Sequence, residues 1–268
     1  MKSTMENAIE LTTFGFKVVP VHTPINTGGV ISCTCKAGCG CKSIGKHPIP
    51  FKWAEAASGD EASIKAWWKT FKNANLGVVA GIQSGVVVVD IDPRNGGDDS
   101  LGDLMGRNGK FPDTATVITG SGGTHYYFKH PGGTVKNSSG AIGAGIDCKG
   151  DGGFVVGPGS LHQCGGFYDW EGSSSPKEAG FAEMPKWLQE IVYSPPKKAT
   201  SPIESGGVVI EGGRNVWLAS LAGAVRRKGC GYKPIMAAIW YANLESCNPP
   251  LEKEECERIA KSIARYEN

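Results

Sequence analysis

The sequence lacks several features that would assign it to a class at once. It has no apolar run of the roughly 18 residues that a membrane span needs, and residues 1–21 lack the pattern of a secretory signal. It also lacks an excess of one charge, with 28 Lys and Arg against 26 Asp and Glu, a formal net charge of +2. A P-loop and an H-x-H pair are missing too, so the chain encodes no helicase of the P-loop type. We therefore expect a cytoplasmic protein without membrane contact.

The bulk composition is that of an ordinary globular protein. Hydrophobic residues make up 40% and charged residues 20% of the 268 positions, enough for one large domain or for a medium and a small one. The balanced charge does not exclude nucleic-acid binding, because a basic groove beside an acidic metal site cancels in the total. The 39 glycines stand in short runs between apolar segments, which predicts many tight turns.

Hydrophobic periodicity predicts a mixture of helices and strands. Apolar residues at helical spacing predict helices over 4–16, 61–72 and 184–192. Short β-branched or aromatic runs predict strands over 17–21, 76–81, 85–92, 114–120, 125–130, 145–150 and 154–160. The second and third of these strands look like a hairpin around residues 82–84. The mixture favours an α+β fold.

The texture of the sequence changes after residue 194. Residues 195–207 are rich in Pro, Ser and Lys and predict a linker, and three helical stretches follow at 213–228, 233–247 and 251–266. We therefore expect a first domain over 1–194, which contains a cysteine-rich insert at 31–47, and a small helical domain over 208–268.

A pair of aspartates ends the most apolar strand. Asp90 and Asp92 close the run GVVVVDID, and residues two apart on a strand point to the same face. Two such carboxylates repel each other unless a cation lies between them, and oxygen ligands suit magnesium or manganese. The plainer interpretation is a strand that ends at the solvent.

A third carboxylate stands beside a lysine in GIDCKGDGG. Asp147 and Lys149 share a strand face, so the acid can hold a metal ion while the lysine neutralises a phosphate oxygen. Taken alone, the two residues fit a surface ion pair equally well.

A glycine-rich turn leads to a histidine in TGSGGTHYYF. The backbone N–H groups of Ser121, Gly122 and Gly123 can form an anion nest for phosphate, and His125 opens the next strand, where it can contact a phosphate as well. Glycine-rich turns are usually only turns, and a histidine that opens a strand is often structural.

Cysteines cluster in CTCKAGCGCKSIGKHP. Cys33, Cys35, Cys39, Cys41 and His47 are five ligands for a tetrahedral zinc site that needs four. Reduced thiols without a metal are the alternative, since disulfides are rare in the cytoplasm. The other cysteines, Cys148, Cys164, Cys230, Cys247 and Cys256, are spread out and are expected to pack.

These motifs, in this order, resemble the three motifs of the archaeo-eukaryotic primase superfamily. The stretches ANLGVVAGIQSGVVVVDID, TGSGGTHYYF and GIDCKGDGGFVVGPGSLH, followed by YDW, resemble its bifunctional primase/polymerase (Prim-Pol) branch over about residues 8–192. The resemblance implies an αβ part and an RRM-like part with the active site between them.

The same resemblance implies roles for individual residues. Asp90, Asp92 and Asp147 correspond to the metal carboxylates and His125 to the nucleotide-binding histidine. Many relatives have Ser where this chain has Gly123, so whether Ser121 or Thr124 supplies a hydroxyl contact stays open.

The insert resembles the cysteine segment that precedes G-K-H-P in many Prim-Pol proteins. That comparison favours Cys33, Cys35, Cys41 and His47 as zinc ligands, with Cys39 extra; if Cys39 replaces His47, Lys46 and His47 can face the nucleotide cleft.

The end of the chain, from GGRN to IAKSIARY, resembles the helical module that follows Prim-Pol domains. Arg214, Arg226, Arg227 and Lys228 are candidate contacts to nucleic-acid phosphates. Basic residues that end a helix also match its dipole, which is the competing interpretation for the last three.

The resemblance implies a template-dependent DNA primase-polymerase. It would use two Mg²⁺ or Mn²⁺ ions and a structural Zn²⁺, with single-stranded DNA and dNTP or NTP as partners, in plasmid or phage replication with any helicase on a separate chain. A catalytically silent single-stranded-DNA or nucleotide-binding accessory domain and a metal-dependent nuclease are the alternatives.

Overall fold

The computed structural model describes residues 2–193, 208–210, 213–226 and 228–264. The predicted linker 195–207 and Arg227 lie outside these residues. The chain divides into two compact units, residues 1–196 and 197–268, each of which is described by itself.

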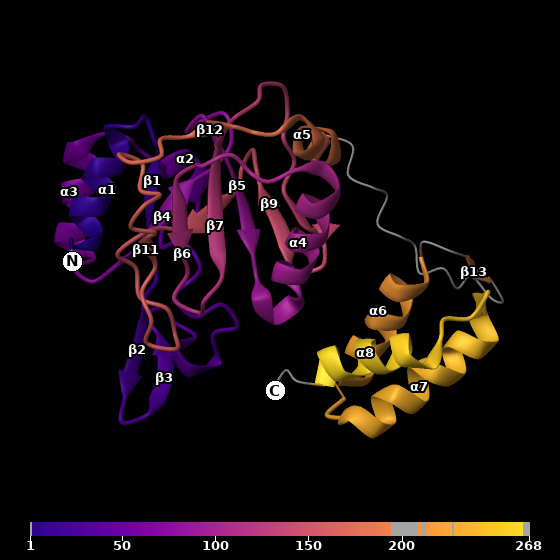
Figure 1. The fold of residues 1–268 in the computed structure, drawn as a ribbon. Coiled ribbons are helices and arrows are strands. Elements are labelled where there is room, and N and C mark those ends of the chain that lie inside the picture. The colour runs from indigo at the N-terminus through magenta and orange to yellow at the C-terminus, as the bar shows by residue number, and fades with distance from the viewer. Residues whose placement is uncertain (1, 194–207, 211–212, 227, 265–268) are drawn as a thin grey trace. The chain divides into compact units, whose positions relative to one another are not determined.

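A three-stranded antiparallel sheet forms one part of the first unit. Its strands β1 (Val18–Val21), β4 (Asn75–Val79) and β10 (Phe154–Val156) lie in the order β1-β4-β10. Helices α1 (Thr4–Thr12) and α3 (Glu61–Thr70) lie beside it (Figure 1). The residue just before each helix, Ser3 for α1 and Asp60 for α3, caps it, because its side chain accepts a backbone N–H of the first turn.

A seven-stranded sheet forms the other part. Its order is β11-β6-β7-β5-β9-β8, and β12 pairs with β7. The strands are β5 (Val86–Ile91), β6 (Thr116–Ile118), β7 (Thr124–Lys129), β8 (Ser138–Gly143), β9 (Ile146–Lys149), β11 (Asp169–Trp170) and β12 (Ala182–Glu183). Strand β5 therefore lies near the middle, with β7 and β9 on its two sides.

The predicted hairpin of residues 76–81 and 85–92 is wrong. Strand β4 belongs to the three-stranded sheet and β5 to the seven-stranded one, and a bridge between Gly81 and Val86 is what connects them locally. The turn between the strands passes the chain from one sheet to the other, so it places the two sheets next to each other.

Two apolar cores cover the two faces of β5. Val86 and Val88 belong to the core that joins both sheets with α1 and α3. Val87, Val89 and Ile91 belong to a second core, which packs under α4 (Gly97–Asn108) and α5 (Lys186–Tyr193). A shift of one residue would exchange the two faces, so this double burial fixes the register of β5.

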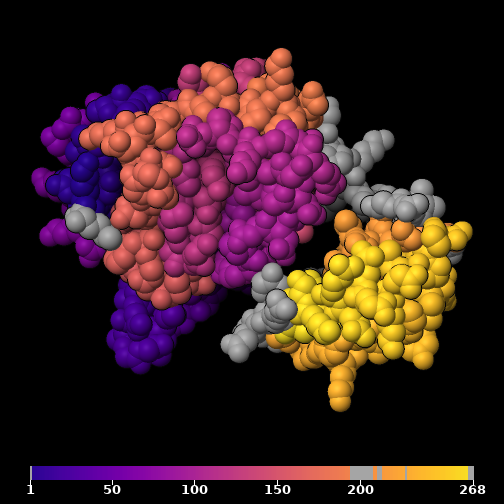
Figure 2. Space-filling model, in the orientation of Figure 1, coloured from indigo at the N-terminus to yellow at the C-terminus, as the bar shows by residue number. Residues whose placement is uncertain are grey.

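The cysteine-rich insert carries its own hairpin. Strands β2 (Pro24–Thr27) and β3 (Val30–Cys33) pair with each other, and a short 3₁₀ helix, η1 (Gly38–Gly40), follows. The hairpin stands out from the body of the unit (Figure 1), and Figure 2 shows the same projection as solid surface. Two further short helices, α2 (Trp53–Ala56) and η2 (Pro93–Asn95), complete the unit.

The described residues of the second unit form three helices. They are α6 (Arg214–Arg226), α7 (Tyr232–Ser246) and α8 (Lys253–Ala264), with the short strands β13 (Val209–Ile210) and β14 (Cys247–Asn248) paired beside them. Leu218, Ile235 and Ile239 are fully buried in its core. The buried Asn243 side chain donates to the Leu251 carbonyl and accepts the Leu251 N–H, which fixes the loop before α8.

The predicted α+β class is confirmed, with sheets in the first unit and helices in the second. Within the described part of the chain, none of the helices combines the length and the apolarity that a membrane crossing demands.

Candidate nucleotidyl-transfer site

One row of side chains crosses the middle of the large sheet. Asp90 on β5 lies directly opposite His125 on β7 and directly opposite Asp147 on β9. Directly opposed residues on neighbouring strands point to the same face. Three of the residues singled out from distant segments of the sequence are therefore neighbours in one row.

Asp92 follows two residues after Asp90 and is held by its own loop. Its carboxylate oxygens accept from the backbone N–H, Nε and a terminal nitrogen of Arg94, at 3.0–3.1 Å, and from the Asn95 amide at 2.8 Å. Burial alone would raise the pKa of Asp92, but the hydrogen bonds and charge of Arg94 outweigh it and lower that pKa. Asp92 is thus an ionised carboxylate that already has a cation beside it.

Asp147 is oriented by three donors. Its Oδ1 accepts from the Ser139 hydroxyl at 2.9 Å and from the Gly140 N–H at 3.1 Å, and its Oδ2 lies 2.9 Å from the Lys149 ammonium. The predicted pairing of Asp147 with Lys149 on one face is therefore present, and it leaves lone pairs on Oδ2 for another cation.

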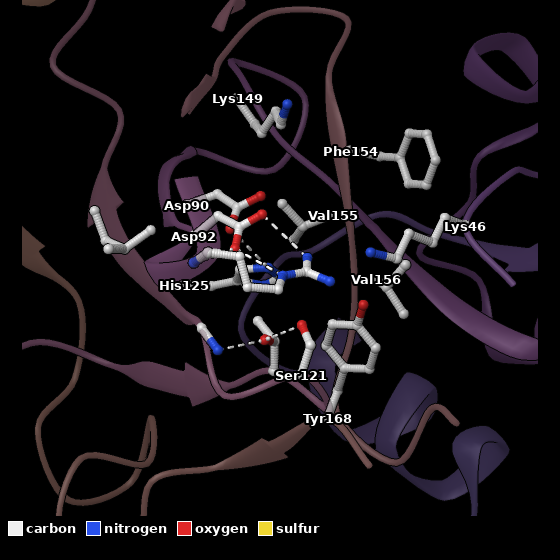
Figure 3. Close-up of a pocket in the computed structure, with 14 residues that line it drawn as sticks. Lys46, Asp90, Asp92, Ser121, His125, Lys149, Phe154, Val155, Val156 and Tyr168 are labelled. Atoms are coloured by element: carbon white, nitrogen blue, oxygen red, sulfur yellow. Dashed lines mark hydrogen bonds and ion pairs between the residues drawn. The ribbon is translucent and has the colours of Figure 1, made fainter. Parts of the chain in front are cut away.

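A cavity of about 280 Å³ opens in front of this row (Figure 3). Asp90, Asp92, His125 and Lys149 line it, whereas Asp147 lies at its margin, next to Asp90, and is not a lining residue. On the other wall stand Phe154, Val155 and Val156 of β10, together with Lys46 and Tyr168. The cavity therefore lies between the two sheets, as expected for a cleft between an αβ part and an RRM-like part.

His125 is buried and neutral. Its side chain is 5% exposed, its Nε2 lies 3.5 Å from Asp90 Oδ1, and its Nδ1 has no hydrogen-bond partner. Burial lowers the pKa of His125, against the opposing effect of the Asp90 carboxylate. A neutral ring still donates one N–H, so His125 can give a hydrogen bond but brings no charge of its own at neutral pH.

The glycine-rich turn differs from the expected anion nest. The Gly122 N–H donates to the Thr119 carbonyl and the Gly123 N–H to the Thr119 hydroxyl, both at 2.9 Å, so these two groups are already used. A Cβ at Gly123 would lie 2.5 Å from the Ile91 carbonyl, so this turn has no room for a side chain at that position. Ser121 and Gly123 line the cavity and Gly122 does not.

Two further cationic residues line the cavity, and Lys46 does so although His47 stays with the cysteines. Arg94 follows the acidic pair, and Lys46 comes from the cysteine-rich insert, far away in sequence. Figure 3 shows Lys46 across the cavity from Asp90 and Asp92, with its ammonium group directed inward. Burial and the charge of Arg94 lower the pKa of Lys46, against the opposing effect of Asp90 and Asp92. The sequence signal for it was the G-K-H-P segment.

A second histidine lies close behind this wall. His162 is 3% exposed, and its Nδ1 lies 3.0 Å from Cys164 Sγ. Burial, aided by the charges of Lys46 and Arg94, lowers the pKa of His162 to about 4. Cys164 is exposed, so the expectation that it packs is wrong for this cysteine, whereas Cys148, Cys247 and Cys256 are buried.

The cysteine-rich insert gathers four of its five candidate ligands. One ligand atom from each of Cys33, Cys35, Cys41 and His47 lies within 4.8 Å of all the others. His47 Nε2 is 3.6 Å from Cys33 Sγ and 3.5 Å from Cys41 Sγ. Three thiols and an imidazole at this spacing are a donor set typical of a structural metal site. Cys39 is exposed and is not part of the group.

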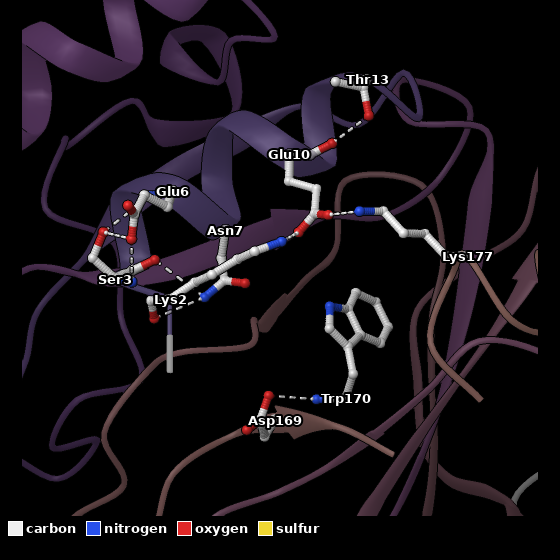
Figure 4. Close-up of polar contacts among 9 residues, drawn as sticks. All are labelled: Lys2, Ser3, Glu6, Asn7, Glu10, Thr13, Asp169, Trp170 and Lys177. Carbon is white, nitrogen blue, oxygen red and sulfur yellow. Dashed lines mark hydrogen bonds and ion pairs between the residues drawn. The ribbon is translucent and has the colours of Figure 1, made fainter. Parts of the chain in front are cut away.

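A smaller cavity, of about 140 Å³, lies away from the acidic row beside α1. Glu10 pairs with Lys2 at 2.6 Å and with Lys177 at 2.8 Å. Figure 4 shows Glu10 between these two lysines, with Trp170 nearby. These ion pairs tie the chain around Lys177 to α1, which is a structural role.

Two of the candidate phosphate-binding residues in the second unit contact its own loops. Arg214 donates to the Pro249 carbonyl and Arg226 to the Cys230 carbonyl, contacts that support the ends of α6 and the loop before α8. Lys228 is exposed, and Arg227 lies outside the described residues.

Comparison with known proteins agrees with the order of the motifs. The family described as "Bifunctional DNA primase/polymerase, N-terminal" matches residues 8–187, and "Primase C terminal 1 (PriCT-1)" matches residues 205–268. Among solved structures, the crystal structure of the primase RepB′ aligns with 97% of this chain and 94% of its own, at 13% identity and a TM-score of 0.35. No curated protein matches the sequence. The chain therefore belongs to the Prim-Pol family of bifunctional DNA primase/polymerases and carries a primase C-terminal module after the Prim-Pol domain.

Proposed function

We propose that the protein is a template-dependent DNA primase-polymerase, in which Asp90, Asp92 and Asp147 hold two divalent metal ions. Family membership supports a role in replication as a primase or polymerase. The observation that carries the finer proposal is the register of β5, which puts Asp90 opposite both Asp147 and His125 at the wall of a cavity.

The residues present fit such a pair of cations. Three carboxylates supply only oxygen donors, the kind that Mg²⁺ and Mn²⁺ prefer. Asp90 and Asp147 are like charges directly opposite each other, an arrangement that costs stability unless cations compensate it. Lys149 compensates Asp147 in part, whereas Asp90 faces the neutral His125. The guanidinium of Arg94 already compensates Asp92. The metal ions, when bound, would lower the pKa of the attacking hydroxyl and stabilise the charge that develops on the phosphate.

In the proposed reaction, the 3′-hydroxyl of a primer or an initiating nucleotide attacks the α-phosphate of a dNTP or NTP. The new phosphodiester bond forms as the bond to the leaving pyrophosphate breaks. His125 donates a hydrogen bond to a phosphate oxygen, Lys149 neutralises phosphate charge, and the Ser121 hydroxyl contacts the same group. These residues contribute positioning and electrostatics, which is most of what a protein supplies in phosphoryl transfer.

Three further assignments belong to the same proposal. The group Cys33, Cys35, Cys41 and His47 would bind a structural Zn²⁺, since thiolates and imidazole suit this ion. Residues 1–194 would be the catalytic domain and 208–268 a helical module joined by a linker, with Lys228 at a nucleic-acid phosphate. The partners would be single-stranded DNA and nucleotides in a plasmid or phage replicon, with any helicase on another chain.

The test is nucleotide incorporation. The protein is incubated with single-stranded DNA, labelled dNTPs or NTPs and Mn²⁺ or Mg²⁺, with and without a primer. Asp90→Ala/Asp92→Ala is the inactive variant, and Asp113→Asn, at an exposed aspartate outside the cavity, is the matched control.

Each outcome separates the candidate functions. Products on unprimed template that vanish in the double variant establish a primase, and extension of primed template alone establishes a polymerase. Degradation of the DNA instead would favour the nuclease. Nucleotide or DNA binding without any metal-dependent synthesis would overturn the proposal in favour of a silent accessory domain.

A further inference from the structure

Lys46 connects two sites that are otherwise separate. It lines the cavity across from Asp90 and Asp92 (Figure 3), and the next residue along the chain is His47, one of the four clustered ligands. A peptide unit thus joins a cation in the nucleotide cavity to an imidazole in the Cys₃His group. Any change in the position of His47 moves Lys46 as well.

The chain is anchored to the body of the unit around Lys46 itself. The His47 carbonyl accepts the His22 N–H at 3.0 Å, and the Ile49 N–H donates to the Pro20 carbonyl at 2.9 Å. On the other side, the buried Asn75 amide donates to the Gly45 carbonyl at 3.2 Å. Gly45 has φ +71°, and a Cβ there would lie 2.6 Å from Pro24. These contacts hold the backbone beside Lys46, and the His47 side chain is the part of this segment that a bound cation would fix in addition.

The preceding loop has little to hold it. Among residues 33–47, only Cys33 and Gly45 are buried, so the segment has almost no apolar core. Backbone hydrogen bonds hold its two ends, from Thr34 to the Thr23 carbonyl and from His22 to the His47 carbonyl. The clustered ligand atoms of Cys33, Cys35, Cys41 and His47 bring the turns between those ends together. A loop of this kind takes its order from a bound metal, because binding of the ion supplies the free energy that a core would otherwise give.

The charges of the cavity suit a metal-bound polyphosphate. Carboxylates stand on one wall and Lys46 on the other, with Arg94 and Lys149 between or beside them. A triphosphate that carries divalent cations presents positive and negative parts at once, and an ammonium group is a common ligand for its oxygens. A single-stranded template would satisfy Lys46 but not the three carboxylates.

We propose that Lys46 binds the triphosphate of the incoming nucleotide, and that a cation held by Cys33, Cys35, Cys41 and His47 positions it there. This inference rests on the proposed function and assigns the cysteine-rich insert a part in substrate binding. The insert would thus affect nucleotide affinity through the peptide bond that joins Lys46 to His47.

The experiment measures nucleotide affinity directly, without turnover. Binding of a non-hydrolysable dNTP analogue in the presence of Mn²⁺, with no DNA, is followed by calorimetry for the zinc-loaded full chain. The variants are Lys46→Ala, Lys46→Arg, Cys41→Ser and the combination of Lys46→Ala with Cys41→Ser. Lys52→Ala is the matched control, because Lys52 stands on the same segment with its side chain 71% exposed and paired to Glu55.

We expect Lys46→Ala to weaken binding about tenfold, which corresponds to about 1.4 kcal/mol, with its zinc content unchanged. Lys46→Arg should recover part of the loss and Lys52→Ala should bind normally. Cys41→Ser should lose both zinc and a similar share of affinity, and the combined variant should lose no more than either change alone. If Cys41→Ser melts below the assay temperature, removal of zinc from the wild type by a chelator replaces it.

Several results would overturn the inference. Normal nucleotide affinity in Lys46→Ala would show that Lys46 does not bind the triphosphate. Normal affinity in the zinc-free chain would show that the metal does not position Lys46. Losses that add fully in the combined variant would mean two independent effects. Failure of the zinc-loaded wild type to bind nucleotide at all would overturn both this inference and the proposed function. The other results of this experiment would overturn the inference alone.

Discussion

A variant that lacks the charge of Asp90 should be more stable than the wild type when no metal is bound. With metal present, the same variant should be less stable than the wild type. The side chains of Asp90 and Asp147 are opposed across β5 and β9, and Asp92 follows on the same face. Like charges directly opposite on a sheet cost about 0.2–1 kcal/mol, and Asp92 adds a weaker repulsion because it lies roughly 6–7 Å farther along the strand. Asp90→Asn keeps the shape of the side chain and removes the charge.

The expected gain without metal is about 0.5 kcal/mol, because Lys149 and Arg94 already lie beside Asp147 and Asp92. His125 does not offset it much, since it is neutral and 3.5 Å from Asp90 Oδ1. For a unit of this size, about 0.5 kcal/mol corresponds to a rise in Tm of about 1–2 °C. A ligand at 100 times its dissociation constant stabilises a protein by about 2.7 kcal/mol, so Mn²⁺ should raise the Tm of the wild type well above that of the variant.

The assay is thermal unfolding in EDTA and in a series of Mn²⁺ concentrations, with Asp113→Asn as the control for loss of one negative charge. The stability order of Asp90→Asn and wild type should reverse between the two conditions. Lower stability of Asp90→Asn in EDTA would show that Asp90 is held by attractive contacts instead. Equal stabilisation of both proteins by Mn²⁺ would mean that Asp90 is not a ligand.

Three further outcomes are expected from other parts of the chain. The folded-state pKa of His162 is about 4, against 6.5 for the free side chain, so the unfolded state takes up the proton first as pH falls. Between pH 6.5 and 4, the free energy of unfolding measured in urea should therefore fall by up to about 1.4 kcal/mol per pH unit more for the wild type than for His162→Gln. Parallel pH dependences of the two proteins would contradict this. Cys35→Ser should lose bound zinc by metal analysis while Cys39→Ser keeps it, and the reverse would move the site to Cys39. Asn243→Ala leaves two buried backbone groups of Leu251 unpaired, so the second unit should lose about 2–4 kcal/mol, and a change below about 0.5 kcal/mol would contradict that accounting.

Elements with a strong local signal could be predicted from the sequence. Strand β5 combines a β-branched run with two carboxylates at spacing two, and the three helices of the second unit have regular apolar periods. The Cys₃His grouping followed from ligand type and density, together with the family resemblance. For β5 and the helices, neighbouring residues alone carry the information, whereas the choice of four ligands among five also needed the resemblance.

Helix α4 was missed because its sequence argues against a helix. GDDSLGDLMGRN contains Gly97, Gly102 and Gly106, which weaken helical propensity, and offers Leu101 as its one well-buried apolar residue. Its first glycine is required by packing, since a Cβ at Gly97 would lie 2.7 Å from the Gly145 carbonyl. Tertiary packing thus determines that this segment is helical, and the sequence of the segment alone does not predict it.

The partner of β4 and the second wall of the cavity were also beyond local reasoning. Both β4 and β5 are apolar strands around a glycine-containing turn, so a hairpin was the simplest interpretation, yet β4 pairs with β1 and β10. Lys46 lines the cavity because the three-stranded sheet, beside which its segment lies, faces the carboxylates. Residues that meet through a change of sheet leave no periodic signal in the sequence.

The register of β5 has a mechanical consequence. Asp90, His125 and Asp147 are joined through the hydrogen bonds of adjacent strands, so they move as one rigid row. Most of the facing wall belongs to the small sheet, which is connected to this row by side-chain packing of residues such as Val78, Val88 and Val155 and, at one end, by the bridge between Gly81 and Val86. Packed side chains can slide where strand ladders cannot. Any closure around a nucleotide should therefore move the small sheet about the Gly81–Val86 bridge. Lys46 would move with that sheet, because the residues beside it are hydrogen-bonded to Pro20 and Asn75, while Asp90 and Asp147 keep their spacing.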